Sequence, residues 1–391
     1  MDDREGEGRP SQGDFPKEEF SAAEAATGGA VPADLSRVEP APDDNSLDAA
    51  VEEFQDDAQN LAQYSSELLK TARQELAKRI VGQEEMIDGL LTVLIAGGHI
   101  LLEGVPGLAK TRAVKALAEI TGLLFKRIQF TPDLLPADLT GTLVWDQSTG
   151  VFSVRRGPVF ANVILADEIN RAPAKVQSAL LEAMEEKQVT IGEKSYALPD
   201  PFFVLATQNP IEHEGTYALP EAELDRFLLK LLVKYPGPEE ELKILDLAPP
   251  FAGAALDSQQ MHLNQVLDLG VLENLRRAAD SVFIDPRILQ YIVSISGASR
   301  PSRSAQGGKS GRDGIHRYIA FGVSPRSSLA LCRCSRIRAL FEGRNFVIPE
   351  DVKAAAYQVM RHRLVLSYEA EADGIDADSV ISRILSLLPM P

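Results

Sequence analysis

The chain has 391 residues, of which 45% are hydrophobic and 25% are charged, so it is long enough for two or three domains with ordinary buried cores. Its net charge of −17 is unevenly placed: residues 1–60 hold 17 Asp and Glu against 4 Lys and Arg, which leaves 40 acidic and 36 basic residues for the rest of the chain. This nearly neutral remainder argues against a general nucleic-acid-binding surface.

The N-terminal segment, residues 1–60, is rich in Asp, Glu, Ala, Pro, Gly and Ser and poor in large apolar side chains. Such a composition cannot bury enough surface to offset the entropy of ordering, so we expect a disordered acidic tail. The segment begins MDDREGEGRP, without the basic and apolar regions of a secretion signal, and nowhere do about 18 apolar residues follow one another. We therefore expect a cytoplasmic protein without a membrane span.

A domain of alternating helices and strands is predicted for residues 61–236. Helical periodicity covers residues 61–77 and 84–96, and the short apolar strand 99–102 is followed by a glycine-rich loop and a helix over 110–121. Further apolar segments predict buried strands at residues 125–130, 162–166, 202–206 and 228–233. Strands separated by helices, such as the helix predicted over 173–186, are typical of a three-layer α/β sandwich around a parallel five-stranded sheet.

Two hairpins and a second domain complete the predicted organisation. Alternating polar and apolar residues over 140–159 and 188–198 predict β-hairpins inserted into the α/β domain. Residues 237–391 predict a small helical domain, with helices over 239–247, 272–279, 286–297, 327–342, 349–362 and 377–388. Within it, residues 300–314 (RPSRSAQGGKSGRDG) are basic and rich in Gly and Ser, and we expect a flexible loop there.

The two cysteines, Cys332 and Cys334, lie two residues apart in one predicted helix, where their side chains point in roughly opposite directions. We therefore expect no disulfide between them and two reduced thiols in the core. The sequence holds no second cluster of Cys and His that would complete a zinc site.

A glycine-rich segment after the first strand, GVPGLAKT, has the context of a phosphate-binding loop. Backbone N–H groups must converge on a triphosphate there, and Gly104 and Gly107 let the backbone approach it closely. Lys110 would contact the β- and γ-phosphates, and Thr111 would ligate Mg²⁺. The general pattern has Gly before the Lys, and Ala109 is compatible with the loop if its φ is negative. The predicted nucleotide-binding residues are Gly104, Val105, Pro106, Gly107, Leu108, Ala109, Lys110 and Thr111.

Two carboxylates, Asp167 and Glu168, follow an apolar strand that ends at Ala166. Because ligands bind at the carboxyl ends of parallel strands, both should face the phosphate loop. Asp167 would hold the hydrated Mg²⁺ and Glu168 would act as general base on the attacking water; the alternative is that Asp167 only caps the next helix. Asn209, at the tip of the next strand, is a candidate for positioning the water or contacting the γ-phosphate, although Asn-Pro is also an ordinary turn.

Two arginines are candidates for a charge-stabilising role. Phosphoryl transfer spreads negative charge over the γ-phosphate, and an arginine placed there accelerates the reaction about 10³–10⁵-fold. Arg226 lies just before the last predicted strand, and Arg326 lies at the start of a helix in the second domain. A surface salt bridge is the alternative for either one, and Asp225 is a neighbouring charge for Arg226.

Together these segments resemble the AAA+ ATPases and, among them, the MoxR family. The resemblance extends over roughly residues 64–388. The segments that carry it are Glu103–Thr111 (EGVPGLAKT), Gln129–Leu139 (QFTPDLLPADL), Gly157–Ala172 (GPVFANVILADEINRA), Gln177–Glu185 (QSALLEAME), Ala206–Tyr217 (ATQNPIEHEGTY), Leu219–Phe227 (LPEAELDRF) and Ser324–Arg326 (SPR). Alanine before the lysine is usual in MoxR proteins, so Ala109 supports the resemblance.

The resemblance implies roles for the residues of the phosphate site. Lys110 and Thr111 correspond to the Walker A motif, and Asp167 and Glu168 to Walker B. Asn209 corresponds to sensor 1. The implied activity is Mg²⁺-dependent hydrolysis of ATP.

The resemblance also implies that subunits act together. Arg226 matches the arginine finger, which contacts ATP held by the neighbouring subunit, and Arg326 matches sensor 2, which reaches the γ-phosphate from the helical lid. Val81, Gly82 and Gln83 match the segment near the adenine. A finger acting in trans implies a homo-oligomeric ring, typically a hexamer.

The resemblance further implies what the ring does. The two hairpins match insertions that tend to line the pore and move with the nucleotide state. MoxR-like proteins are thought to act as chaperones in the maturation of partner complexes, often with partners that carry von Willebrand factor A domains.

Three other functions fit part of the pattern. A nucleic-acid motor would use the basic segment 300–314, but the near-zero charge of the body argues against it. A metal-chelatase motor subunit has similar hairpins, so only its partner would distinguish it. A nucleotide switch that does not hydrolyse ATP is disfavoured by the intact Asp167–Glu168 pair.

Overall fold

A five-stranded parallel β-sheet organises the first half of the chain. The computed structural model describes residues 44–211, 215–246, 262–300 and 314–391. The sheet has the strand order β2-β5-β8-β1-β9, and each neighbouring pair is parallel. Its strands are β1 (Ile100–Glu103), β2 (Phe125–Gln129), β5 (Val163–Asp167), β8 (Phe203–Gln208) and β9 (Leu229–Leu232). The predicted parallel five-stranded sheet is confirmed.

The central strands are apolar because both faces of the sheet are covered. In β1, Ile100 and Leu102 face one hydrophobic core and Leu101 faces the other, as the alternation of side chains along a strand requires. The prediction that all strands are buried was wrong for β2, where Lys126 and Arg127 are exposed. This strand lies at the edge of the sheet and pairs only with β5, so its polar side chains keep access to water.

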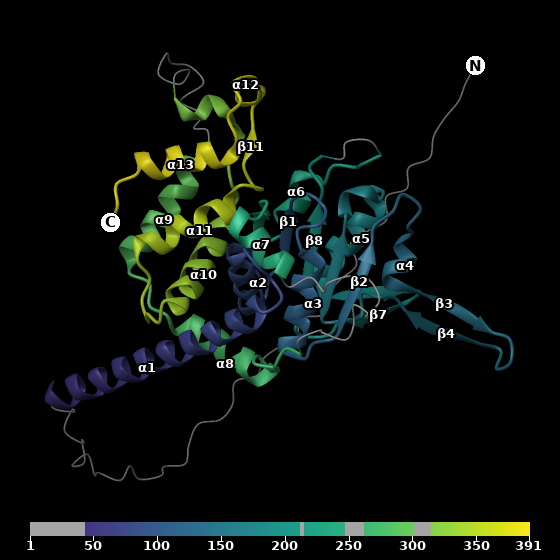
Figure 1. Cartoon of the computed structure of the whole chain (residues 1–391), viewed down its shortest axis with the longest axis horizontal. Coiled ribbons are helices and arrows are strands. Elements are labelled where there is room, and N and C mark those ends of the chain that lie inside the picture. Colours follow the sequence, from purple (N-terminus) through teal and green to yellow (C-terminus); the bar gives the residue numbers. More distant parts are fainter. Residues whose placement is uncertain (1–43, 212–214, 247–261, 301–313) are drawn as a thin grey trace, which may run out of the picture. The chain divides into compact units, whose positions relative to one another are not determined.

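Helices cover both faces of the sheet and complete the layers of an α/β sandwich (Figure 1). One hydrophobic core joins α2 and α3 to one face, and the other core joins α5 to the opposite face. The helices of this part are α2 (Glu84–Ala96), α3 (Lys110–Thr121), α4 (Pro136–Thr140), the 3₁₀ helix Ile169–Arg171, α5 (Ala174–Glu186) and α6 (Glu221–Leu224).

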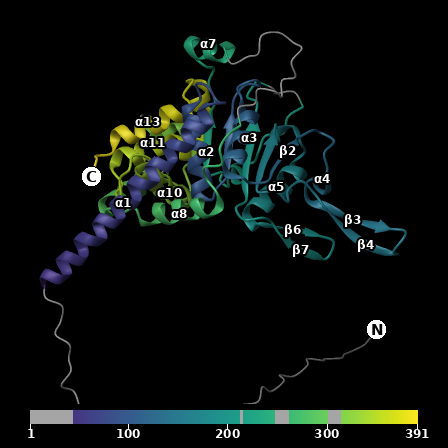
Figure 2. The same ribbon diagram turned by 60° about the horizontal axis from the view of Figure 1, so that its bottom comes forward.

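The two predicted β-hairpins are present. Both extend from the α/β part on the same side (Figure 2). Their strands are β3 (Gly141–Asp146) with β4 (Val151–Arg156), and β6 (Gln188–Ile191) with β7 (Lys194–Ala197). The first turn is held by Asp146 Oδ1, which accepts the Ser148 N–H at 2.9 Å. The hairpins touch each other, because a Cβ at Gly192 would lie 2.7 Å from a methyl carbon of Leu143.

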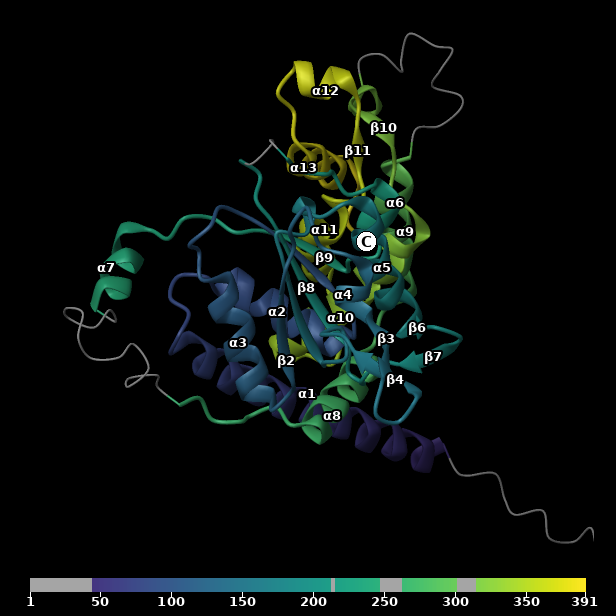
Figure 3. The ribbon, with the colours of Figure 1, turned by 90° about the vertical axis from the view of Figure 1, so that its right-hand side faces the viewer.

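The chain after β9 is mainly helical, as predicted, and also contains a small two-stranded sheet that the sequence pattern did not reveal (Figure 3). Its strands have three and two residues, too few to show a period. The elements are α7 (Pro238–Asp246), α8 (Leu269–Ser281), α9 (Pro286–Ala298), the 3₁₀ helix Ile315–Tyr318, β10 (Ile319–Phe321), α10 (Pro325–Phe341), α11 (Pro349–Met360), β11 (Val365–Leu366), α12 (Tyr368–Ala372) and α13 (Ala377–Leu387). Within the described ranges, no helix is long and apolar enough to cross a bilayer.

Two predicted segments lie largely outside the described residues, namely 1–43 of the acidic tail and 301–313 of the basic segment. The end of the expected tail is described, and it is helical: α1 spans Asp44–Ala77 and thus begins well before residue 61. Ala, Glu and Gln are good helix formers, and the argument from acidic composition left this propensity out.

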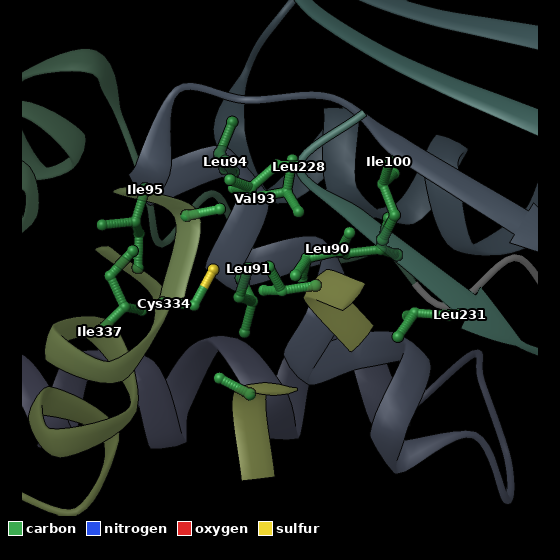
Figure 4. Packing of buried hydrophobic residues seen from close by; sticks show 14 of the residues in the cluster. Leu90, Leu91, Val93, Leu94, Ile95, Ile100, Leu228, Leu231, Cys334 and Ile337 are labelled. Atoms are coloured by element: carbon green, nitrogen blue, oxygen red, sulfur yellow. The ribbon is translucent and has the colours of Figure 1, made fainter. Parts of the chain in front are cut away.

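The helical part packs directly on α2 of the α/β part. Figure 4 shows Cys334 and Ile337 of α10 close to Leu91 and Ile95 of α2, while Leu231 of β9 lies farther along the same cluster. Both cysteines are free thiols, as predicted, and burial raises the pKa of Cys334 to about 12. A continuous hydrophobic core therefore joins the lid helices to the sheet that carries the candidate site.

Candidate active site

The predicted phosphate loop connects β1 to α3 at the carboxyl end of the sheet. Gly107 has a φ of +89°, a left-handed value that favours glycine, and a Cβ there would meet no described atom within 4 Å. Gly104 is needed for a different reason, because a Cβ at this position would lie 2.8 Å from the carbonyl oxygen of Val233. The loop is therefore open at Gly107 and tightly packed at Gly104.

The backbone conformation of Ala109 differs from the one expected from the sequence. Its φ is +55° and its ψ is +13°, so alanine occupies the left-handed region here and φ is not negative as the sequence argument required. The Cβ makes this conformation costlier by about 1 kcal/mol than it is for glycine, but it does not exclude it. Since Ala109 is the N-cap of α3, the helix starts directly at Lys110 and leaves its unpaired N–H groups at the loop.

The loop, β2, β5 and β8 together enclose a pocket of about 380 Å³. Lys110 Nζ donates to the carbonyl oxygen of Gly104 at 2.6 Å, which holds the lysine across the loop. Burial lowers the pKa of Lys110, and the nearby Asp167 and Glu168 oppose this shift. Val105 instead packs against the hydrophobic core. The pocket is lined by Pro106, Gly107, Leu108, Ala109, Lys110, Thr111, Arg112, Arg127, Gln129, Asp167, Glu168, Thr207 and Asn209.

Asp167 is the last residue of β5, and its two carboxylate oxygens have different partners. Thr207 of β8 donates its hydroxyl to Oδ1 at 2.7 Å and accepts the backbone N–H of Glu168 at 2.8 Å. Arg127 of β2 donates to Oδ2 at 2.6 Å from one nitrogen and at 3.1 Å from another. The carboxylate is thus fixed in the pocket and neutralised by a cation from the same chain.

Glu168 leaves the strand with a φ of +58°, which turns its side chain away from the path of β5 into the pocket lining. Its Oε2 accepts a hydrogen bond from Gln129 Nε2 at 2.7 Å and lies 3.3 Å from Nε of Arg171. Asn209, one residue beyond β8, is buried and accepts the Ile211 N–H on its Oδ1 at 3.2 Å. The structure therefore brings Glu168 and Asn209 into one pocket with Lys110 and Thr111.

The donor atoms in this pocket fit Mg²⁺ together with phosphate. Thr111 and Asp167 supply the hard oxygen ligands that this ion prefers. In the described part of the chain, no group of three or more His, Cys, Asp and Glu side chains could hold a metal alone. A magnesium ion here would take its remaining ligands from phosphate oxygens and water, as is usual for nucleotide sites.

The predicted adenine segment lies outside the phosphate pocket. Gly82 and Gln83 line a second pocket of about 240 Å³ together with residues 231–235, which include the end of β9 and the segment after it. Val81 is not among its lining residues. Gln83 Nε2 donates to the carbonyl oxygen of Lys234 at 3.0 Å. Gly82 has a φ of +70°, and a Cβ there would meet the carboxylate of Glu240 at 2.4 Å. Val233, which lines this second pocket, lies next to Gly104 of the phosphate loop.

The two predicted arginines are brought together with each other, but not with the phosphate loop. Arg226 lies 3.0 Å from Glu185 Oε2, and Arg326 donates to Glu185 Oε1 at 2.8 Å. Neither arginine is among the lining residues of the phosphate pocket. Glu185 is on the last turn of α5, so it joins an arginine of the α/β part to an arginine of the lid.

The backbone next to Arg226 is fixed by the lid. Asp225 accepts hydrogen bonds from Arg363 Nε at 2.7 Å and from the Ser324 hydroxyl at 3.0 Å. Arg363 is buried and also donates to the carbonyl oxygens of Phe227 at 2.7 Å and of Asp225 at 3.3 Å. Each arginine thus forms a salt bridge, as the alternative from the sequence stated, but the partner is Glu185. Asp225, the neighbouring charge named for Arg226, binds Arg363 instead.

Several site residues were missed by sequence reasoning. Thr207 was visible as a polar residue in an otherwise apolar strand, next to a strand that ends in carboxylates. Arg127 and Gln129 were hidden by the prediction that β2 is fully buried. Glu185 and Arg363 had no local signal, because their partners are far away along the chain.

Comparisons with known proteins show the family to which the chain belongs. Residues 99–229 match the family "ATPase family associated with various cellular activities (AAA)", and residues 312–384 match the AAA lid domain. The chain is 46% identical to "Chaperone MoxR1" of Mycobacterium tuberculosis, over 83% of this chain and 82% of that protein. It is 42% identical to the uncharacterized protein YeaC of Bacillus subtilis, over 83% and 95% of the two chains.

A more distant relative and a solved structure extend the comparison. The chain is 32% identical to "Protein MoxR" of Methylorubrum extorquens, over 81% of this chain and 93% of the relative. A crystal structure from Cytophaga hutchinsonii, of a protein assigned as an ATPase, superimposes with a TM-score of 0.75 and is 43% identical. That similarity covers 88% of this chain and 99% of the other.

Proposed function

Because the chain belongs to the MoxR family of AAA+ ATPases, we propose that it hydrolyses Mg²⁺-bound ATP at the interfaces between subunits of a homo-oligomeric ring, with six subunits. One observation carries this proposal: the candidate catalytic residues form two separate groups on one chain. The phosphate loop and the carboxylates share a pocket, whereas Arg226 and Arg326 share Glu185 elsewhere. A complete site then needs two copies of the chain in a head-to-tail contact.

In the phosphate pocket, each residue has a proposed task. Lys110 and the N–H groups at the start of α3 bind the β- and γ-phosphates. Thr111 and Asp167 hold Mg²⁺, which neutralises charge that develops on the phosphates. Glu168 accepts a proton from the attacking water, and Asn209 orients that water. The segment Val81–Gln83 contacts the adenine.

The second group serves the neighbouring subunit. Arg226 and Arg326 contact the γ-phosphate there and stabilise the charge of the transition state. Hydrolysis removes the group that both arginines bind, so the lid and the adjacent subunit can relax. The hairpins β3–β4 and β6–β7 would pass this motion to a protein held in the pore.

The proposed biological role is chaperone-like remodelling or maturation of partner proteins, for which a partner with a von Willebrand factor A domain is the first candidate. The relative from Mycobacterium tuberculosis is named a chaperone, which supports this role. In the proposed division, residues 1–60 are a tail, residues 61–236 are the ATPase core and residues 237–391 are the lid. The site of action is the cytoplasm.

Two substitutions test the ATPase assignment. Lys110→Ala should abolish ATP binding. Glu168→Gln keeps the shape of the side chain but removes the base, so it should bind ATP normally and lower kcat by about 10²–10⁴-fold. Equilibrium binding of ATP and steady-state phosphate release measure both effects. Unchanged turnover in Glu168→Gln would show that Glu168 is not the base.

The same variant can identify the partner. Glu168→Gln should remain in its ATP-bound state and retain bound proteins, so a pull-down with ATP should enrich a partner that the Lys110→Ala variant does not retain. Salt-sensitive binding of DNA at low micromolar protein would instead favour a nucleic-acid motor. Enrichment of a metal-chelatase subunit would favour that class of motor.

A further inference from the structure

We propose that Glu185 is a positioning residue that holds Arg226 and Arg326 side by side, ready for the γ-phosphate of a neighbouring subunit. This inference rests on the proposed function, in which both arginines act on the neighbour's ATP. Glu185 itself would touch neither ATP nor the attacking water. Its role would be to fix the distance and orientation of the two cations before the subunits meet.

The geometry gives each arginine one oxygen of a single carboxylate. A terminal nitrogen of Arg226 lies 3.0 Å from Oε2, and a terminal nitrogen of Arg326 lies 2.8 Å from Oε1. A single small anion with two oxygens therefore bridges the two guanidinium groups. A γ-phosphate also presents several oxygens to guanidinium groups, so the same pair would bridge one such group.

Charge explains why a carboxylate is needed at this point. Two cations at such a short distance repel each other, and a shared anion turns this repulsion into two attractive contacts. The hydrogen bond from Arg326 and then the charge of Arg226 lower the pKa of Glu185, so the carboxylate stays ionised at neutral pH. Without it, the two arginines would move apart.

The arginines can bind a phosphate without leaving Glu185. A guanidinium group has five N–H donors, and each arginine uses one terminal nitrogen on the carboxylate. The side chains of Arg226, Glu185 and Arg326 are 28%, 38% and 54% exposed, so an approaching subunit can reach all three.

The carboxylate has a rigid support. Glu185 follows the buried residues Leu181, Ala183 and Met184 of α5, which pack against the sheet. The backbone on both sides of Arg226 is held by Arg363, which donates to the carbonyl oxygens of Asp225 and Phe227. A rigid carboxylate and a rigid backbone leave little freedom to the guanidinium group of Arg226.

A role for Glu185 as a latch on the two arginines predicts the opposite change in ATP hydrolysis. If Glu185 were a latch that competes with the γ-phosphate, its removal would free the arginines and raise activity at low ATP concentrations. If it positions them, its removal should lower kcat. The sign of the change therefore decides between the two roles.

The test is steady-state ATP hydrolysis by the full chain, at a concentration where size-exclusion chromatography shows complete assembly of every variant. Glu185→Gln should lower kcat by about tenfold, the effect of losing one charge-assisted hydrogen bond, without changing the affinity for ATP or the melting temperature. Glu186→Gln removes the same charge from the next residue, which is exposed, and should match the wild type. Glu185→Asp should recover part of the loss.

A double-variant comparison shows whether Glu185 acts through an arginine. In an Arg326→Ala background, Glu185→Gln should lower kcat less than it does alone, because one of its two partners is already absent. An unchanged or increased kcat in Glu185→Gln would overturn the inference. If Arg226→Ala and Arg326→Ala themselves hydrolysed ATP normally, the proposed function would fail first. If both lost activity while Glu185→Gln did not, only the positioning role would fail.

Discussion

The phosphate pocket and the arginine cluster are built in opposite ways. In the pocket, acidic residues carry the proposed chemistry and are held by groups of the same chain: Arg127 binds Asp167, and Gln129 binds Glu168. In the cluster, arginines carry the proposed chemistry and are held by an acidic residue, Glu185. In each region the side chains proposed for the chemistry are held by a partner from the same chain. The pocket has no contact with Arg226 or Arg326, and the arginine cluster has no phosphate loop.

Under the proposed function, this difference explains why one copy of the chain would not form a complete site. Both regions are fixed on elements that pack against the same sheet: α3 and α10 belong to one hydrophobic core, and α5, which carries Glu185, belongs to the core on the opposite face. Neither region can therefore fold over onto the other without breaking this packing. A complete site would instead form when a second copy places its arginine cluster at the phosphate pocket of the first copy. Repeating such a head-to-tail contact with a rotation that closes would form the proposed ring.

Removal of Arg226, the proposed arginine finger, should lower the rate of ATP hydrolysis more than any other change predicted here. Arg226→Ala should lower kcat of the assembled protein by about 10³-fold or more, because the transition-state charge loses its strongest partner. The affinity for ATP should not change, since Arg226 does not line the pocket of its own subunit. Rapid-quench or steady-state phosphate release measures kcat, and fluorescence titration measures binding.

A matched control removes a different arginine. Arg277 forms an exposed ion pair with Glu273 at 2.6 Å on α8, and Arg277→Ala should hydrolyse ATP like the wild type. If Arg226→Ala weakened ATP binding by unassembled monomers, Arg226 would belong to its own subunit's pocket, and the contrast between the two regions would disappear.

The sequence predicted the phosphate pocket more completely than the arginine cluster, for a physical reason. Lys110, Asp167 and Asn209 each follow an apolar strand, and parallel strands bring their carboxyl ends together, so local patterns were enough. The meeting of Arg226 and Arg326 at Glu185 depends on how the lid packs, and no local pattern encodes a contact across 141 residues.

The backbone of the pocket was predicted less well than its side chains. The left-handed conformations of Ala109 and Glu168 have no signal in the sequence, because neither residue is Gly or Asn. The polar side chains of β2 were also missed, since its place at the sheet edge depends on strand order and not on composition.

The smallest expected effect concerns Ala109. With a φ of +55°, alanine is strained, so Ala109→Gly should raise the free energy of unfolding by about 0.5–1 kcal/mol and leave kcat within about twofold. Denaturant unfolding measures the change. Ala118→Gly, in the regular part of the same helix, should lower the free energy of unfolding by about 1 kcal/mol. Equal losses in both variants would mean that Ala109 is not strained.

The most direct test of the central claim is to mix two inactive variants. Glu168→Gln lacks the base but retains Arg226, and Arg226→Ala lacks the finger but retains Glu168. If the site is shared between subunits, mixing equal amounts before assembly should restore hydrolysis, because about a quarter of the interfaces would combine an intact pocket with an intact finger. A mixture that stays as inactive as its two components would contradict a site shared between subunits.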